Sequence, residues 1–276
     1  LRSTNTPMTI SPTATFTGGR CWHAPVHEAS AVHLAGTIHQ SKRHIWEFDG
    51  LVARVLTVLA HPDDAEIWAG GTLARQVLEG DEVLICSLAG DPGSLRATEA
   101  GEGAQVLGAQ VTVLNQADRH MRQSDELVRA LASLLADYRP NIIITHWEQD
   151  AHSDHVVTNN AARAAIVAAS GLSGELDMVL ACDTYLSSGR DGIFTPDLYI
   201  DVSDVWETKL EAIRKHASQD PEYYIQTIER QCWLHGARAK VRYAEGFRRI
   251  PVYGRLGGAL HRLGRASTPT ERKRNG

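Results

Sequence analysis

Between residues 54 and 182, short apolar runs alternate with longer amphipathic segments. Runs rich in β-branched residues predict buried strands at Arg54–Ala60, Glu82–Ala89, Gln110–Leu114, Asn141–Thr145 and Met178–Cys182. Apolar positions at helical spacing predict helices between them, at Ala65–Glu79, Leu95–Leu107, Ser124–Tyr138 and Asp154–Ser170. Because strands alternate with helices, we predict an α/β fold of the Rossmann-like, doubly wound type, a mostly parallel sheet with helices on both faces.

The pattern is less regular beyond Gly189. It predicts one more strand at Asp197–Val202 and helices at Trp206–His216 and Glu222–Lys240. Residues 1–50 are expected to form a partly loose N-terminal extension, since Thr, Ser, Pro and Gly dominate its first part. Residues 51–250 are expected to form the folded domain, followed by a basic C-terminal tail over residues 251–276.

Composition excludes several classes of protein. The formal net charge of −5 means that the chain has no excess of basic residues of the kind that binds nucleic acid. No stretch approaches the ~20 consecutive apolar residues of a membrane span, and the N-terminus shows no signal-peptide pattern. The four cysteines form no CxxC pair, and Cys86 and Cys182 fall within predicted strands. We therefore expect buried thiols and a cytoplasmic protein.

Two polar motifs follow predicted strands. His61–Asp64 (HPDD) comes directly after the first predicted strand. His146 comes directly after the fourth predicted strand, and His152–His155 (HSDH) lies a few residues further on. The carboxyl ends of neighbouring parallel strands meet at one edge of a sheet, so these loops converge if the two strands are neighbours. Histidine and carboxylate ligands with open positions suit a catalytic Zn²⁺, with Fe²⁺ as the alternative.

Each motif also has a simpler explanation when it is taken alone. Asp64 could cap a helix that begins at Ala65, and Ser153 or Asp154 could cap the next one. Two adjacent carboxylates repel each other, however, unless something cationic lies beside them. The two motifs at two strand ends together favour a metal site.

A strand followed by AHPDDAE (Ala60–Glu66), with HSDH after a later strand, resembles the PIG-L/LmbE family of metal-dependent N-acetylglucosaminyl de-N-acetylases. Further matches are GDPGSLRATEA (Gly90–Ala100), FTPDLYIDVS (Phe194–Ser203) and KLEAIRKHASQ (Lys209–Gln219). The resemblance covers about residues 54–216, most of the expected folded domain, which would then be a metal-dependent deacetylase. The family usually has Glu where this chain has Asp91.

The resemblance implies a role for each residue of the two motifs. Three residues would be metal ligands: His61, Asp64 and His155. Asp63 would be the general base that takes a proton from the attacking water. His152 would stabilise the oxyanion or protonate the leaving amine, and Asp154 would orient a histidine.

Substrate contacts are expected in the loops after the second and third strands. The family uses an Arg at the position of Arg96 to hold sugar hydroxyls, whereas the alternative is a surface Arg paired with Glu99. Asp91 and Asp118 are the other expected substrate contacts. His216 is expected either to line the cleft or to pack in the core.

The expected activity is zinc-dependent hydrolysis of a linear amide, which removes an acetyl group from an N-acetylglucosaminyl unit of a small glycoconjugate. The Arg- and Ala-rich composition favours an antibiotic or other specialised-metabolite intermediate. The alternatives are a thiol-sugar precursor of the mycothiol or bacillithiol type and a non-haem Fe(II) oxygenase. A nucleotide-binding module is disfavoured, because no G-x-G-x-x-G follows the first strand. The expected partner is a small amino-sugar substrate, and the sequence predicts no oligomeric state.

Overall fold

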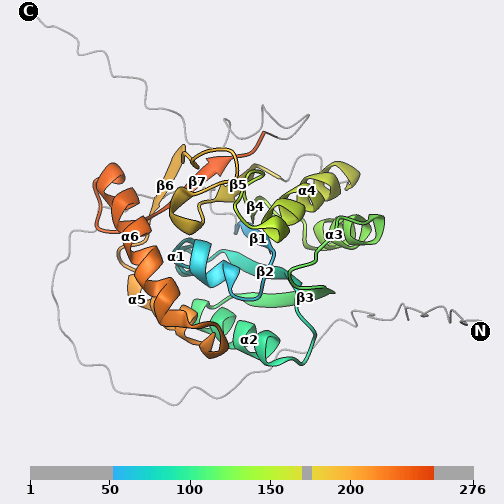
Figure 1. Cartoon of the computed structure of the whole chain (residues 1–276), viewed down its shortest axis with the longest axis horizontal. Helices are drawn as coiled ribbons and strands as arrows, with labels where there is room; N and C mark the ends of the chain where they lie inside the picture. Colours follow the sequence, from blue (N-terminus) through green and yellow to red (C-terminus); the bar gives the residue numbers. More distant parts are fainter. Residues whose placement is uncertain (1–51, 170–175, 252–276) are drawn as a thin grey trace, which may run out of the picture. The chain divides into compact units, whose positions relative to one another are not determined.

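The computed structural model describes residues 52–169 and 176–251 (Figure 1). The N-terminal extension expected over residues 1–50 lies outside the described residues, as does the expected basic tail apart from Pro251. Among the described residues, no helix has the length and apolar character that crossing a membrane requires. Cys86 and Cys182 are buried free thiols, as expected, and Cys232 is a third.

The centre of the described domain is a mixed sheet with the strand order β3-β2-β1-β4-β5-β7-β6. Its strands are β1 (Arg54–Leu59), β2 (Glu82–Ala89), β3 (Gln110–Gln116), β4 (Ile142–Thr145), β5 (Met178–Cys182), β6 (Leu198–Asp201) and β7 (Ala244–Arg249). The first five are parallel, whereas β7 runs antiparallel to both β5 and β6. The predicted doubly wound, mostly parallel sheet is confirmed.

Helices cover both faces of this sheet (Figure 1). They are α1 (Asp64–Leu78), α2 (Leu95–Leu107), α3 (Asp125–Tyr138), α4 (Ser153–Ala168), α5 (Trp206–Arg214) and α6 (Pro221–Ala239). α1, α2, α5 and α6 share one hydrophobic core with the sheet, and α3 and α4 share the other. The central strands are therefore buried on both sides, which is why they consist of nearly continuous apolar residues.

The sequence pattern did not predict β7. Its residues, AEGFRR, show no apolar alternation, although the first four are buried. Glu245 is buried because it forms an ion pair inside the protein. Gly246 has no side chain, so it adds nothing to a pattern of apolar and polar positions. Other predicted elements agree with the structure to within two residues at most of their ends, with α4 ending at Ala168 rather than Ser170.

A buried ion pair fixes the position of α1. Nζ of Lys209, on α5, lies 2.5 Å from Oε1 of Glu245 and also donates to the carbonyl of Ile67 at 2.7 Å. The Glu245 carboxylate accepts the backbone N–H groups of Gly71 (2.9 Å) and Thr72 (2.8 Å). Side chains from α5 and β7 thus hold the middle of the helix that begins at Asp64, the last residue of the HPDD motif.

Gly71 allows α1 to approach the end of β6 closely. A Cβ atom at this position would lie 2.7 Å from Cβ of Val202, much closer than van der Waals contact. A larger residue would push the helix away from Val202 and from the Glu245 carboxylate, which lies 3.1 Å from the same point.

The strand order reverses between β1 and β4. From β1 the chain continues through β2 to β3 on one side, and from β4 it continues to β5 on the other. β1 and β4 are paired directly, with Val58 opposite Thr145 near their carboxyl ends. The loops that follow them therefore emerge side by side at a topological switch point, the usual place for a ligand in this kind of sheet. The two polar motifs lie in these loops.

Candidate active site

Both motifs lie at helix N-termini, but not as the caps that the simpler explanation requires. Asp63 is the N-cap residue of α1, and its side chain makes no capping hydrogen bond among the described residues. Asp64 is already the first residue of the helix. At α4 the N-cap is His152, whose Nδ1 accepts the N–H of Asp154 at 3.2 Å. Caps formed by Asp64, Ser153 or Asp154 are therefore wrong.

The Asp64 carboxylate lies among three histidines. Its Oδ2 accepts the backbone N–H of His61 at 2.7 Å and lies 3.1 Å from Nδ1 of the same residue. Nε2 of His146 lies 3.1 Å from Oδ2, and Nε2 of His155 lies 3.5 Å from Oδ1. Oδ1 also accepts the indole N–H of Trp68 at 3.0 Å. This arrangement fixes the carboxylate at the base of the site.

These residues fit a divalent cation. Ligand atoms of His61, Asp64 and His155 all lie within 4.8 Å of one another. Nε2 of His155 is buried and has no hydrogen-bond partner among the described residues. Two imidazoles and one carboxylate beside an open pocket are a donor set of catalytic zinc sites and of non-haem iron sites. Two overlapping groups also bring ligand atoms together: His61, His152 and Asp154, and His146, Asp150 and His155.

The charges in this cluster stabilise one another. Burial acts to raise the pKa of Asp64, but His155, His61 and His146 hold it well below its usual value. Burial acts to lower the pKa of His155, yet Asp64 and Asp150 raise it to about 10. In this arrangement a protonated His155 supplies the positive charge that the carboxylates need, and a cation would take over that function.

Arg96 lies beside Asp63. Nη2 of Arg96 is 3.1 Å from Oδ1 of Asp63, and Nη1 is 2.8 Å from Oδ2 of Asp118. Asp63 is 4% exposed, and burial together with the neighbouring Asp64 raises its pKa, while Arg96 acts to lower it. Arg96 thus joins the two carboxylates across the mouth of the site.

The alternative pairing of Arg96 with Glu99 is wrong. Glu99 instead accepts the backbone N–H of Ser218 at 2.8 Å and its hydroxyl at 2.5 Å. This contact holds the segment before α6 against α2, and the next residue, Gln219, lines the pocket. His216 is buried with Nε2 at 3.3 Å from Oε2 of Glu66, so it packs in the interior.

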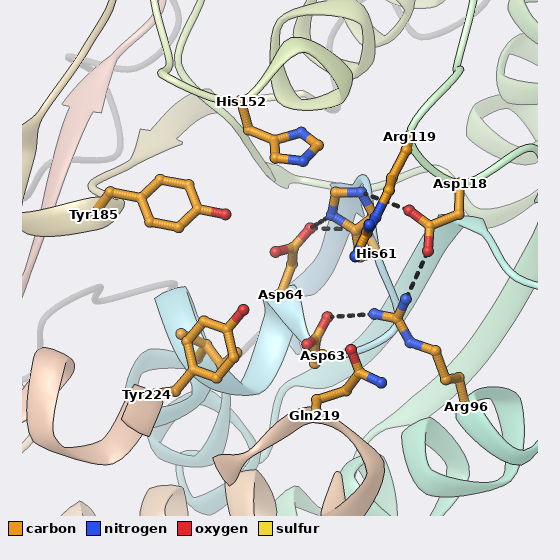
Figure 2. A pocket seen from close by; sticks show the side chains of 11 residues that line it. His61, Asp63, Asp64, Arg96, Asp118, Arg119, His152, Tyr185, Gln219 and Tyr224 are labelled. Carbon is orange, nitrogen blue, oxygen red and sulfur yellow. Dashed lines mark hydrogen bonds and ion pairs between the residues drawn. The ribbon is translucent and has the colours of Figure 1, made fainter. Parts of the chain in front are cut away.

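An open pocket of about 440 Å³, counted with its solvent-filled mouth, lies above these groups (Figure 2). Its lining consists of His61, Asp63, Asp64, Ile67, Arg96, Asp118, Arg119, His152, Tyr185, Gln219 and Tyr224. Figure 2 shows Arg96 and Asp118 on one wall and the phenols of Tyr185 and Tyr224 on the opposite one. Polar atoms therefore face the cavity from both walls, which suits a substrate rich in hydroxyl groups.

Most of the residues expected from the sequence meet at this pocket. His155 and Asp154 lie behind the lining and are buried, with Oδ2 of Asp154 at 3.5 Å from Nε2 of His61. Asp91 lies apart from them, exposed in the turn between β2 and α2 and outside the lining of the pocket.

Sequence reasoning missed Asp150, which is fully buried beneath the site. Its Oδ2 lies 3.0 Å from Nδ1 of His155 and accepts the hydroxyl of Thr184 at 2.5 Å. Its Oδ1 accepts the backbone N–H of His152 at 2.8 Å. A carboxylate two residues before HSDH was the available signal. The missed pocket residues Tyr185 and Tyr224 lie in segments with no motif, and Gln219 ends one of the matching segments.

Comparison with known proteins finds a matching family model and relatives that are named as deacetylases. Residues 56–166 match the sequence model of the family described as PIG-L: GlcNAc-PI de-N-acetylase. A diacetylchitobiose deacetylase of Thermococcus kodakarensis is 29% identical over 230 residues, which cover 72% of this chain and 84% of that protein. A 1D-myo-inositol 2-acetamido-2-deoxy-α-D-glucopyranoside deacetylase of Corynebacterium glutamicum is 29% identical over 217 residues, covering 60% and 75%.

The fold is also found in a solved structure with a different activity. GalB, a 4-carboxy-2-hydroxymuconate hydratase of Pseudomonas putida, superimposes with a TM-score of 0.64 at 24% identity, covering 72% of this chain and 97% of that one. This likeness concerns the fold, which by itself does not decide between hydrolysis and hydration.

Proposed function

We propose that the protein is a metal-dependent hydrolase that removes the acetyl group from an N-acetylglucosaminyl unit of a small glycoconjugate, since residues 56–166 match the PIG-L family model. The observation that carries this proposal is a second buried carboxylate, Asp63, beside the Asp64–histidine cluster and facing the same pocket. The two relatives named as deacetylases of acetamido sugars support it. We assign the activity to the domain expected over residues 51–250.

His61, Asp64 and His155 are the residues that would hold the cation, which we propose to be Zn²⁺, with Fe²⁺ as the alternative. We choose this group because Asp64 is the carboxylate that three imidazoles approach, and because His61 and Asp64 also line the pocket. When bound, the cation would polarise the acyl carbonyl and make water more acidic.

Asp63 acts as the general base in this proposal. A base must be within reach of the attacking water and must have a pKa close to the working pH. Asp63 lines the pocket, and its burial raises the carboxyl pKa, which makes the carboxylate a stronger base than an exposed Asp. Arg96, 3.1 Å away, holds one carboxylate oxygen in place and leaves the other for the proton.

His152 donates a hydrogen bond to the oxyanion that develops on the acyl group. Its Nδ1 accepts the N–H of Asp154, so in the neutral ring the proton lies on Nε2. The ring is edge-on to that of His61, with centroids 4.8 Å apart, and lines the pocket. The amide nitrogen is a poor leaving group unless it receives a proton, and the proton that Asp63 has taken from water is the one passed to it.

The remaining pocket residues bind the sugar. Arg96 and Asp118 offer charged donors and acceptors on one wall, and Gln219 adds an amide. Asp91 is exposed outside this lining, so contact with it requires a substrate that extends beyond the pocket. We propose a specialised-metabolite intermediate, such as an antibiotic precursor, as the acceptor; this rests on composition alone. The thiol-sugar precursor is the alternative, favoured by the Corynebacterium relative.

The test is acetate release by the metal-loaded protein from a panel of N-acetylglucosaminides. The panel comprises N,N′-diacetylchitobiose, an inositol N-acetylglucosaminide and an N-acetylglucosaminyl glycopeptide. Acetate and a free amine in equal amounts support the proposal, and the most rapidly cleaved member identifies the acceptor class. Failure to release acetate from every member, or hydration of an unsaturated dicarboxylic acid instead, contradicts it. The Asp63→Asn protein serves as the inactive control.

A further inference from the structure

A left-handed turn carries Tyr185 to the pocket. Three consecutive residues, none of them glycine, have positive φ: Tyr185 at 46°, Leu186 at 56° and Ser187 at 64°. In L-residues this conformation brings Cβ close to the backbone carbonyl, so it costs free energy at each position. Burial of Leu186 does not offset this cost, since its side chain is 50% exposed. What the turn achieves is the placement of Tyr185.

Buried polar groups hold the turn in this conformation. The backbone N–H of Leu186 donates to Oε1 of Gln231 at 2.8 Å, and the hydroxyl of Ser187 donates to Oδ2 of Asp183 at 2.6 Å. Nε2 of Gln231 in turn donates to the backbone carbonyl of Asp183 at 3.0 Å. A strained backbone that its surroundings fix in this way is typical of residues that serve a functional site.

The residue before the turn connects it to the candidate cation site. The hydroxyl of Thr184 donates to Oδ2 of Asp150, and the same carboxylate oxygen lies 3.0 Å from Nδ1 of His155. One buried carboxylate therefore positions both a proposed cation ligand and the start of the turn.

The Tyr185 ring packs against residues of the cation site. It stacks on His155, with ring centroids 5.7 Å apart and planes inclined by 17°, and meets Trp68 edge-on at 5.0 Å. The hydroxyl faces the pocket, on the side of His152 and Asp64 (Figure 2). Among the described residues, no hydrogen-bond partner of this hydroxyl is found.

The phenol remains a hydrogen-bond donor under physiological conditions. A tyrosine phenol ordinarily has a pKa of about 10. The hydroxyl therefore keeps its proton at neutral pH and can donate it to an acceptor in the pocket.

We propose that Tyr185 is a further catalytic residue, whose hydroxyl donates a hydrogen bond to the acyl oxygen of the scissile amide. This inference rests on the proposed deacetylase function. The acyl oxygen is the good acceptor of an amide, and negative charge develops on it as water attacks, so the hydrogen bond strengthens in the transition state. The phenol keeps its proton throughout, and no covalent bond to Tyr185 forms or breaks.

The position of the ring favours the acyl oxygen over a sugar hydroxyl. The scissile amide must lie beside Asp63 and the proposed cation ligands, and Tyr185 is stacked on one of those ligands. Arg96 and Asp118, which we propose to contact the sugar, lie on the opposite wall of the pocket (Figure 2). The two walls would thus hold different parts of the substrate.

Tyr185→Phe tests this role, because it removes the hydroxyl and retains the stacked ring. With the best substrate of the panel we expect kcat to fall by about 10²-fold, the usual effect of losing one donor to a developing oxyanion, while KM changes little. A second readout is binding by the metal-loaded protein. A phosphonamidate analogue of the tetrahedral state should bind more weakly to the variant by a similar factor, and the free amine product should bind equally well.

Tyr223→Phe is the matched control, because Tyr223 is 63% exposed and lies outside the pocket; its kinetics should equal those of the wild type. Metal content and urea midpoint should be the same in all three proteins. An unchanged kcat in Tyr185→Phe, or a rise in KM alone, overturns the proposal. A wild-type protein that releases no acetate contradicts the proposed function itself, whereas an active wild type with an unimpaired Tyr185→Phe variant contradicts only the role of Tyr185.

Discussion

Nη2 of Arg96 lies 3.1 Å from Oδ1 of Asp63, so the arginine expected to bind a sugar also holds the proposed general base. Its other terminal nitrogen binds Asp118 at the rim of the pocket. A substrate that contacts Arg96 would therefore act on the position and basicity of Asp63 as well. In the proposed mechanism, substrate binding and proton transfer would be linked through this one guanidinium group.

Replacing Arg96 with Ala should move the acidic limb of the pH profile of kcat/KM to higher pH. The guanidinium lowers the pKa of Asp63, so its removal raises that pKa and leaves less of the base deprotonated at neutral pH. At pH 7 we expect kcat/KM to fall about tenfold or somewhat more, the value of one charged hydrogen bond. Arg96→Lys should keep the limb closer to its original position, since the charge remains. Superimposable pH profiles for wild type and Arg96→Ala would contradict this link.

Substitution of the two adjacent aspartates should separate metal binding from proton transfer. Asp64→Ala should lower metal content and activity together, because Asp64 is a proposed ligand. Asp63→Asn should keep the metal and lose about 10²–10⁴-fold in kcat, the usual effect of losing a general base. Elemental analysis and acetate release on the same samples check both. Full metal occupancy in Asp64→Ala would mean that the metal is held by another of the overlapping groups. Normal turnover in Asp63→Asn would mean that another residue is the general base.

Asp150→Asn should weaken metal binding although Asp150 is not a proposed ligand. Its carboxylate lies 3.0 Å from Nδ1 of His155 and fixes the orientation of that ring. Loss of such a partner typically lowers metal affinity by about 10–100-fold. Competition with a chromophoric chelator measures the affinity, and Asp191→Asn, at an exposed position, is the control. Equal affinities in the two variants would show that the Asp150–His155 contact does not hold the ligand.

Metal affinity should increase with pH. In the metal-free protein the carboxylates of Asp64 and Asp150 raise the pKa of His155 to about 10, so the ring is protonated at neutral pH. A protonated nitrogen cannot bind a metal, so binding must release this proton, and the dissociation constant should fall about tenfold for each pH unit. Titrations with the chelator at pH 6, 7 and 8 measure the slope. A dissociation constant that does not change with pH would show that metal binding releases no proton from His155.

Lys209→Met should destabilise the protein strongly. It leaves the Glu245 carboxylate buried without its cation, a change that costs about 3–5 kcal/mol in other proteins. Lys215→Met is the control, since Lys215 is half-buried at the end of the same helix and forms no ion pair among the described residues. Urea unfolding gives both free energies. A loss below about 1 kcal/mol would show that the buried pair contributes little to stability.

The sequence by itself determined the alternation of strands and helices and the two motifs at the ends of β1 and β4. These features are local, because a buried parallel strand must be apolar along its whole length and its loop is where polar residues can accumulate. The sequence did not determine that β1 and β4 are neighbours; pairing between residues 87 positions apart, such as Val55 and Ile142, depends on the whole sheet. β7 was missed for the same reason, since Glu245 belongs in the core only once Lys209 is opposite it.

The finer organisation of the site was decided only by the tertiary structure. Arg96 meets Asp63 rather than Glu99, and Asp150 rather than Asp154 lies against His155. Tyr185 reaches the pocket through a left-handed turn that no local preference of its residues would favour. In each case the partner comes from a distant segment. Which carboxylate a side chain contacts, or which conformation it adopts, depends on distances that only the folded chain fixes.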